Sequence, residues 1–386
     1  MKGKLGLLWL GCLLTALVGC AQIPLEAPAQ PVSAQVKVVL PPVEELVFSP
    51  GEAVTVSGKT LTGLVWENVT YISLKELTDA LGVTLDDVPL SPALRFPWRG
   101  QPVVVMPDST NLGIGDREVP LSGKILFHEG KILVPARDMA GALTLGLYED
   151  TENRHLYLTP EAGHRDIPTG YHVPTLMYHG VGDQTWGFEE LFVRPADLEA
   201  QLQYIRDNGY TTIHFSDLAQ VDTIQKPVLL TFDDGYVDNY TELYPLLQKY
   251  NAKATVFVVT GALGVNPNFM TWEQAKEMSD SGLVSIQSHT VTHRDLTSLT
   301  AEEQRRELAQ AKLDIVRNIG REPYVLCYPT GFYNWDTLNA MEGLYAMGVK
   351  INGNAYYTDH SPLEINRWYV ARYTSLYTFG DMLKNN

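Results

Sequence analysis

Two adjacent aspartates and two histidines have the types and spacing of a hydrolytic metal site. Asp233 and Asp234 follow an apolar run, and His289 comes 55 residues after Asp234, with His293 four residues further on. One carboxylate and two neutral imidazoles bind zinc and leave positions open for water and substrate. Each motif alone is weak, because an Asp-Asp-Gly stretch is common in solvated turns and two histidines at this spacing are common on helices. Together they predict a metal site formed by Asp234, His289 and His293.

Such a site needs strands that end at the same edge of a sheet. From residue 173 onward, apolar strand-like runs alternate with amphipathic helix-like runs. Seven strands with interleaved helices predict an α/β fold whose parallel sheet closes into a barrel or nearly so. We expect strands at 175–178, 211–214, 228–232, 254–259, 284–287, 324–328 and 349–352, and helices at 195–207, 239–249, 271–281, 301–318 and 334–347.

Residues 231–236 (TFDDGY) and 288–293 (SHTVTH) resemble the motifs of the polysaccharide deacetylases, the NodB homology or carbohydrate esterase family 4. The resemblance implies a distorted (β/α)7 barrel, with Asp233 as catalytic base and Asp234, His289 and His293 as ligands of a divalent metal. Zinc is favoured, with cobalt, nickel or iron as alternatives. The implied reaction is hydrolysis of N-acetyl groups of an extracellular or cell-wall glycan, either an N-acetylglucosamine polysaccharide or peptidoglycan, with release of acetate. This chemistry needs a base that lies beside the metal ion without binding it, and Asp233 fits that role.

Amide cleavage also needs an acid for the leaving nitrogen. Many family members take it from a C-terminal Leu-x-x-His motif, which this sequence lacks. Residues 176–180 (LMYHG) resemble the corresponding position in exported poly-N-acetylglucosamine deacetylases, so His179 is predicted to be the acid. A histidine at a strand end can also serve packing alone, and His360 and His214 are the lesser candidates.

The third family motif, Arg-x-Pro-aromatic-Gly, is altered here to CYPTG at residues 327–331. The usual arginine tunes the base, and Arg367 is predicted to supply that charge from another strand. The backbone amide of Thr330 is predicted to be an oxyanion donor, since that role does not depend on the side chain. Among several nearby aromatic residues, Tyr236 is expected to contact a sugar ring, although aromatic residues in a barrel more often belong to its core.

Residues 43–160 contain short strand-like runs separated by turns, and two similar segments, 71–81 and 133–143, are offset by 62 residues. Each reads as a strand that runs into a short amphipathic helix. With residues 148–158, the pattern resembles the stalk domain at the N-terminus of copper amine oxidases, without a copper ligand set. We therefore expect a smaller α+β stalk domain with two internal repeats before the barrel.

The first 20 residues resemble a bacterial lipoprotein signal. Lys2 and Lys4 precede an apolar run that ends at Gly19-Cys20, so 1–19 would be the signal peptide and Cys20 the lipidated residue. An ordinary cleaved signal or an uncleaved anchor is the alternative. Residues 20–42 read as a Pro/Ala-rich tether, 161–172 as a linker and 173–386 as the deacetylase domain. This pattern predicts an exported protein that is anchored by lipid to the outer face of the bacterial cell membrane.

The charge of the chain makes nucleic acid an improbable partner. The formal net charge is −16 and no basic cluster follows the signal. An alternative function is an inactive carbohydrate-binding or cell-wall scaffolding lipoprotein. The altered third motif and the missing C-terminal histidine favour it, but the intact acids and histidines oppose it. A third hypothesis keeps the same site and directs it at an acetyl ester or a cyclic amide.

Overall fold

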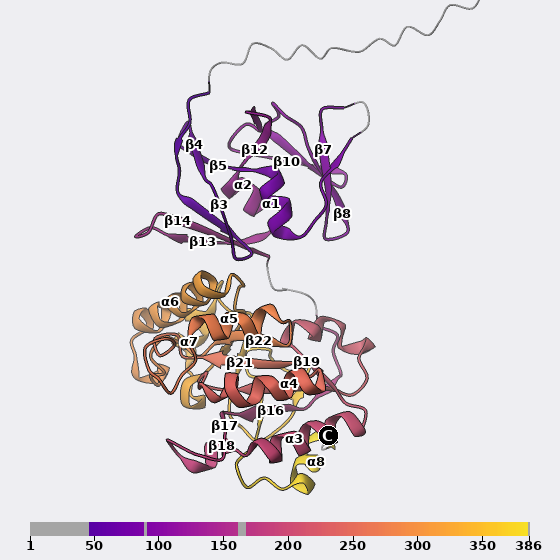
Figure 1. The fold of residues 1–386 in the computed structure, drawn as a ribbon, viewed down its shortest axis with the longest axis vertical. Helices are drawn as coiled ribbons and strands as arrows, with labels where there is room; N and C mark the ends of the chain where they lie inside the picture. Colours follow the sequence, from indigo (N-terminus) through magenta and orange to yellow (C-terminus); the bar gives the residue numbers. More distant parts are fainter. Residues whose placement is uncertain (1–45, 89–90, 161–166, 385–386) are drawn as a thin grey trace, which may run out of the picture. The chain divides into compact units, whose positions relative to one another are not determined.

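The computed structural model describes residues 46–88, 91–160 and 167–384 (Figure 1). The predicted signal peptide, Cys20 and the tether lie outside these ranges, as does part of the predicted linker. Within the ranges, no helix combines the length and apolar character that a membrane span requires.

Residues 46–160 form three small sheets and two short helices. The sheets have the strand orders β1-β4-β5-β12-β11, β10-β9-β8-β7-β6 and β13-β14-β2-β3. The strands are β1 Ser49–Pro50, β2 Ala53–Val56, β3 Lys59–Leu61, β4 Leu64–Trp66, β5 Val69–Ser73, β6 Asp86–Asp87, β7 Leu94–Trp98, β8 Gln101–Val105, β9 Asn111–Ile114, β10 Arg117–Pro120, β11 Leu126–His128, β12 Lys131–Pro135, β13 Leu145–Asp150 and β14 His155–Pro160.

The two similar sequence segments each form a strand that runs directly into a helix. Strand β5 leads into α1 (Leu74–Leu81), and β12 leads into α2 (Ala136–Ala142). The two strands pair with each other in antiparallel register. Leu77 of α1 and Met139 of α2 occupy equivalent positions in the two repeats, and both side chains are fully buried. A small apolar core therefore forms between the repeats. That this part serves as a stalk stays a prediction.

Residues 167–384 are built on a curled parallel sheet of eight strands. Its order is β24-β23-β22-β21-β20-β16-β26, and β19 pairs with the first half of β20. The strands are β16 Thr175–Tyr178, β19 Thr211–Ile213, β20 Pro227–Phe232, β21 Ala254–Val258, β22 Val284–Ser288, β23 Val325–Cys327, β24 Met347–Val349 and β26 Trp368–Tyr369. The sequence predicted seven strands and missed β26, which joins the sheet beside β16 through two residue pairs.

Helices cover the outer face of this sheet, as Figure 1 shows. They are α3 Pro195–Asp207, α4 Tyr244–Tyr250, α5 Trp272–Asp280, α6 Ala301–Ile319, α7 Trp335–Met341 and α8 Leu376–Lys384. A π-helical turn lies at Asn239–Leu243, and 3-10 segments lie at Glu189–Leu191, Phe215–Thr223, Leu296–Ser298 and Pro329–Gly331. Residues 167–384 also contain two small sheets of two strands each. One pairs β15 His172–Val173 with β25 Tyr356–Tyr357, and the other pairs β17 Gly180–Val181 with β18 Phe192–Val193.

Helix α7 is shorter than the sequence predicted. We expected it to reach residue 347, but it ends at Met341 because Glu342 is extended and Gly343 adopts a left-handed φ of 71°. Strand β24 consequently starts at Met347, two residues earlier than predicted.

Alternation along β20 determines which side chains reach the interior of the curled sheet. Val228, Leu230 and Phe232 pack in the core shared with the helices, whereas Leu229 packs in a second core inside the curl. Since successive strand residues point to opposite faces, Thr231 follows Leu229 inward. Asp233 comes next in this series, directly beyond the end of the strand.

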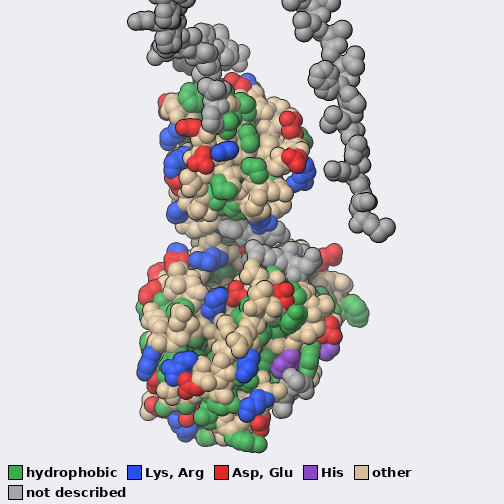
Figure 2. All heavy atoms as spheres, turned by 90° about the vertical axis from the view of Figure 1, so that its right-hand side faces the viewer, with side chains coloured by type: hydrophobic (Ala, Val, Ile, Leu, Met, Phe, Trp, Pro, Cys, Tyr) green, Lys and Arg blue, Asp and Glu red, His purple; other side chains and the backbone are tan. Residues whose placement is uncertain are grey.

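Acidic and basic side chains are interspersed on the face of the molecule that Figure 2 presents. On that face the basic side chains do not gather into one patch.

Candidate metal centre and active site

The candidate residues meet at the carboxyl edge of the parallel sheet. Asp233 and Asp234 follow β20, His289 follows β22, and His179 follows β16. Parallel strands that end together bring residues far apart in sequence to one place, which is how barrel enzymes assemble active sites. Arg367 reaches the same region from the segment just before β26.

Asp234, His289 and His293 form a compact set of possible metal ligands. Asp234 Oδ1 lies 3.5 Å from His289 Nε2 and 3.5 Å from His293 Nε2. One ligand atom from each residue falls within 4.8 Å of the other two. The donor chemistry of one carboxylate and two imidazoles fits a divalent ion with open coordination positions.

His289 is held with one nitrogen free to bind a metal. Its Nδ1–H donates a 2.8 Å hydrogen bond to the Cys327 carbonyl, so Nε2 carries the lone pair on the side of Asp234. The ring is 2% exposed, and burial lowers its pKa to about 4. The imidazole is therefore neutral around pH 7, as metal binding requires.

Unusual backbone conformations place these ligands. Asp234 has φ of 74°, Thr290 of 67° and His293 of 57°, all in the left-handed region that non-glycine residues rarely adopt. Asp234 can thereby turn away from the direction of Asp233, although the two are neighbours. Such strain persists only where surrounding contacts impose it, and functional sites are where it concentrates.

Glu307 of α6 supports the loop between the two histidines. Its carboxylate accepts hydrogen bonds from the backbone N–H groups of Val291 and Thr292, at 3.1 and 3.0 Å, and from the Thr292 hydroxyl at 2.8 Å. The sequence gives no sign of this role, because a glutamate that supports a loop from an amphipathic helix looks the same in sequence as a solvated one.

Arg367 binds Asp233 with both ends of its guanidinium. Nη1 donates to Oδ1 at 2.6 Å and Nη2 donates to Oδ2 at 2.8 Å, while Nη1 also donates to the Thr231 hydroxyl at 3.0 Å. Arg367 is fully buried and Asp233 is 2% exposed. Burial by itself would raise the pKa of Asp233, but the Arg367 charge outweighs it and holds this pKa well below its usual range. The structure thus brings the charge of Arg367 onto Asp233, the contact that the sequence predicted.

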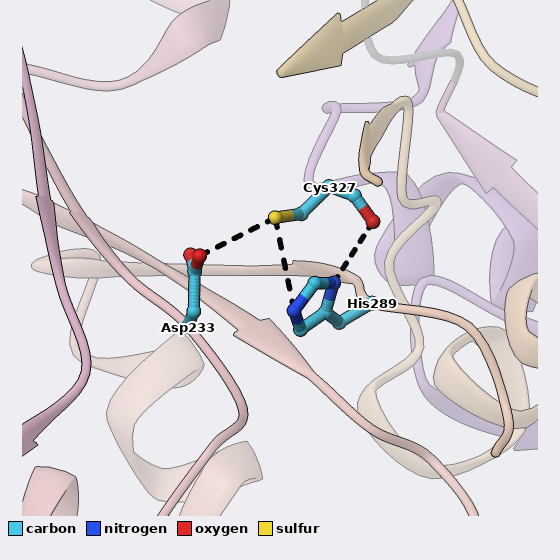
Figure 3. A group of neighbouring side chains, drawn as sticks. All are labelled: Asp233, His289 and Cys327. Atoms are coloured by element: carbon cyan, nitrogen blue, oxygen red, sulfur yellow. Dashed lines mark hydrogen bonds between the residues drawn. The ribbon is translucent and has the colours of Figure 1, made fainter. Parts of the chain in front are cut away.

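The Cys327 side chain lies between Asp233 and His289, as Figure 3 shows. Its Sγ is 3.5 Å from Asp233 Oδ2 and 3.8 Å from His289 Nε2, and it accepts a 3.2 Å hydrogen bond from Arg367. Burial raises the pKa of this thiol well above its usual value, so it stays protonated. Asp233, His289 and Cys327 are also close enough to hold an ion. However, the positive charge of Arg367 beside both Asp233 oxygens opposes a second cation there, so we assign the ion to the set with Asp234.

His179 reaches Asp233, and the two lesser candidates do not. His179 Nε2 lies 4.0 Å from Asp233 Oδ2, its side chain is 14% exposed, and its backbone carbonyl accepts a 2.9 Å bond from Asn239. His214 instead bonds to the Leu283 carbonyl at 3.1 Å, and the His360 ring packs on Tyr357. Among residues 167–384, His179 is thus the histidine beside Asp233 that is not in the metal set.

Thr330 and Tyr236 lie on the segments that follow β23 and β20. Thr330 lies in the turn after β23 with a left-handed φ of 61°. Tyr236 is buried, and this burial together with the nearby Asp234 carboxylate raises the pKa of Tyr236. Its ring also contacts Trp186, a residue that the sequence analysis did not single out.

Comparison with known proteins places these residues in a recognised family. The family model described as polysaccharide deacetylase matches residues 220–348, a range that includes both acids and both metal-site histidines but neither His179 nor Arg367. YxkH of Bacillus subtilis, named as a polysaccharide deacetylase, is 35% identical over 219 residues, which are 55% of this chain and 76% of that protein. The poly-β-1,6-N-acetyl-D-glucosamine N-deacetylase of Escherichia coli is 30% identical over 135 residues, 30% of this chain and 20% of that protein.

Solved structures show the same fold. The Streptococcus pyogenes deacetylase PplD, in complex with acetate, matches with a TM-score of 0.52 and 31% identity over 56% of this chain and 99% of that one. A Bacillus anthracis protein named as a polysaccharide deacetylase matches with a TM-score of 0.53 and 20% identity over 88% of this chain and 99% of that one, which shows likeness of fold alone. The curled parallel sheet is therefore the fold of known deacetylases.

Proposed function

Since the chain belongs to the polysaccharide deacetylase family and is a hydrolase of C–N bonds, we propose that it is a metal-dependent N-deacetylase of an extracellular glycan that contains N-acetylglucosamine. One observation carries this proposal: Asp233, bound by Arg367, lies beside the Asp234, His289 and His293 set without belonging to it. The site thus offers metal ligands and a separate ionised base, which metal-assisted hydrolysis of an amide requires.

Asp234, His289 and His293 would hold the ion, with zinc favoured by their chemistry and cobalt, nickel or iron as alternatives. When bound, a divalent ion supplies Lewis-acid polarisation of the acetamide carbonyl and lowers the pKa of a water. The hydrogen bond from His289 Nδ1 to the Cys327 carbonyl keeps that ring in the tautomer that binding needs.

Asp233 would take the proton of the attacking water. Each carboxylate oxygen has about two lone-pair positions, so the contacts with Arg367 leave capacity on both oxygens. The charge of Arg367 keeps the carboxylate ionised in its buried position. His179 Nε2 lies 4.0 Å from Oδ2, so the base and the predicted acid are close enough to act on the same substrate group.

His179 would then donate a proton to the leaving nitrogen, and the Thr330 amide would donate a hydrogen bond to the oxyanion. The C–N bond breaks, the amine leaves on the sugar, and acetate is the second product. Asn239, through its bond to the His179 carbonyl, holds the acid at the end of β16.

The proposed location follows from residues outside the described ranges. The signal-like segment before Cys20 supports export and lipidation, which would anchor the enzyme to the outer face of the cell membrane. Residues 43–160 would then act as a stalk between the tether and the catalytic part. A scaffold without catalysis is disfavoured, because such a protein gains nothing from a buried, arginine-bound base beside a ligand set.

Acetate release by the full chain tests the proposal. The substrates are poly-N-acetylglucosamine, peptidoglycan, chitin fragments and an acetylated xylan as the ester alternative, each measured with and without chelator and after return of zinc. We expect acetate and an equal amount of free amine from an N-acetylated glycan, loss of both with chelator, and recovery with zinc. Acetate from the ester alone, or chelator-insensitive release, would contradict the proposal.

A further inference from the structure

Two adjacent polar side chains, Asp238 and Asn239, bind the backbone of the segment that carries His179. The Asn239 amide donates a 2.9 Å hydrogen bond to the His179 carbonyl. The Val181 backbone N–H donates to Asp238 Oδ1, also at 2.9 Å. Asn239 donates to the same carboxylate oxygen at 3.2 Å, so the two side chains brace each other. Asp238 and Asn239, here named the clamp, therefore hold the backbone at residues 179 and 181.

The clamp is buried, and it belongs to the same segment as the proposed base. Asp238 is 9% exposed and comes five residues after Asp233, and Asn239 is fully buried at the start of the π-helical turn. Such turns are rare and are frequent at functional sites. The Asp233 backbone N–H also donates to the Tyr178 carbonyl at 2.9 Å. One short segment thus fixes the backbone before, at and after the proposed acid relative to the base.

A hold on the backbone matters because the His179 ring lacks a partner on its second nitrogen. Nε2 lies 4.0 Å from Asp233 Oδ2, whereas the buried Nδ1 has no hydrogen-bond partner among the described residues. A catalytic imidazole is usually oriented by a carboxylate or a carbonyl at the nitrogen that does not react. Without that support, the direction of the His179 ring depends on the backbone that carries it.

Packing keeps the neighbouring residues in place independently of the clamp. Gly180 pairs with Phe192 of β18, and a Cβ at Gly180 would fall 2.4 Å from an atom of the Phe192 ring. The pairing of β17 with β18 does not involve the clamp side chains. Removal of one clamp contact should therefore loosen His179 without unfolding the segment around it.

We propose that Asp238 and Asn239 are positioning residues that hold the His179 imidazole where it can protonate the leaving nitrogen. This inference rests on the proposed function and extends it to two side chains outside the metal set. Small displacements of a reacting group cost a large part of the rate. The effect should be greater on amides than on acetyl esters, because a leaving amine needs a proton more than a leaving sugar oxygen does.

A double-mutant cycle on the metal-loaded full chain tests the clamp. Asn239→Ala and His179→Ala are made singly and together, and kcat is measured on an N-acetylated glycan and on an acetylated xylan. We expect Asn239→Ala to lose about tenfold on the amide and less than about threefold on the ester. In the His179→Ala background it should change amide turnover by less than about twofold, because the group that it positions is gone. A tenfold loss in both backgrounds, or equal losses on amide and ester, would overturn the inference.

Variants at Asp238 separate the backbone contact from the charge. An amide at this position still accepts from the Val181 N–H, whereas an alanine side chain does not. Asp238→Asn should therefore retain most of the amide turnover, and Asp238→Ala should lose about tenfold. If Asp238→Asn were as impaired as Asp238→Ala, the charge would be what matters and the clamp would be refuted.

Gln304→Ala is the matched control for the loss of a buried side-chain amide. Gln304 is fully buried and donates to the Leu299 carbonyl at 3.2 Å, in α6 and away from His179. This variant should lose stability and keep the ratio of amide to ester turnover of the wild type. A ratio that fell as far as in Asn239→Ala would show that general loosening produces the effect, which would also refute the clamp.

NMR of protein labelled at histidine follows the His179 ring without turnover, with His179→Ala to assign its signals. We expect these signals to shift or broaden in Asn239→Ala, while those of His214, which bonds to the Leu283 carbonyl, stay in place. Unchanged His179 signals would overturn the clamp and leave the deacetylase function intact. A wild type that releases no acetate, but whose His179 signals respond to Asn239→Ala, would overturn the proposed function and leave the placement of the ring by the clamp.

Discussion

Replacement of Arg367 by glutamine should disturb the stability and the pH response of the protein together. Both partners of the pair are buried, and Arg367 contributes two hydrogen bonds of 2.6 and 2.8 Å to Asp233. Removal of one partner of a buried ion pair leaves the other charge uncompensated and costs about 3–5 kcal/mol. We expect the free energy of unfolding of Arg367→Gln at neutral pH to fall by that amount, measured by urea denaturation.

The sign of the pH effect follows from the direction of the shift. Because the native pKa of Asp233 lies below its usual value of about 3.9, the native pair stabilises the fold above that pH, and this stabilisation is lost as the pH falls through the native pKa. In Arg367→Gln the main influence that lowers the pKa of Asp233 is gone, so burial raises this pKa above that of the wild type. The carboxyl then takes up a proton at mildly acidic pH, so the stability deficit should shrink between pH 7 and about pH 5.

Turnover should report the same change. Asp233 must be ionised to accept a proton, so the acid limb of the profile of kcat/KM against pH should move to higher pH in Arg367→Gln. Arg372→Gln is the matched control, because Arg372 is also a buried arginine but donates to backbone carbonyls. It should destabilise the protein without moving the acid limb. An Arg367→Gln protein within about 0.5 kcal/mol of the wild type, with an unmoved acid limb, would refute the role assigned to the pair.

Three further outcomes follow from the site. His179→Ala should keep its metal content and lose about 10²–10⁴-fold in amide turnover, with a smaller loss on an acetyl ester, whose leaving oxygen needs less protonation; normal amide turnover would exclude His179 as the acid. Cys327 should resist an alkylating reagent in the native protein and react after denaturation, as mass spectrometry would show, because the thiol is buried and its pKa is raised; rapid native labelling would contradict this placement. Glu307→Gln should weaken metal affinity about 10–100-fold, because Glu307 holds the loop between the two histidines. Glu303→Gln, on the same helix but at its N-terminal cap, should leave metal affinity unchanged. Equal metal affinities of the two variants would show that the histidine loop does not depend on Glu307.

Residue pattern predicted the elements that position the site with good accuracy. The strand before Asp233 was recognisable from its apolar run and the acids at its end, and α3 spans the predicted residues. The structure brings Asp234, His289 and His293 together because their strands end at one edge of the sheet. It also places Arg367 on Asp233, as the missing motif arginine suggested.

Other features depend on contacts that a pattern does not carry. The left-handed backbone at Asp234 and His293 has no sequence signature, because neither residue is a glycine. Strand β26 has two residues, too few for a periodic signal, and its place depends on pairing with β16, nearly 200 residues earlier by sequence number. Trp186 contacts Tyr236 only once the chain folds, so this contact could not be predicted from the loop that carries Trp186.

The separation of base from metal ligands is tested most directly by metal content and acetate release in Asp233→Asn, compared with Asp234→Asn. Asp233 is bound to Arg367, whereas Asp234 faces both histidines. We predict that Asp233→Asn binds one equivalent of zinc, as the wild type should, and releases no measurable acetate from the N-acetylated glycan. Asp234→Asn should lose both the zinc and the activity. Full turnover in Asp233→Asn, or loss of its zinc, would contradict the assignment of Asp233 as a base that does not bind the ion.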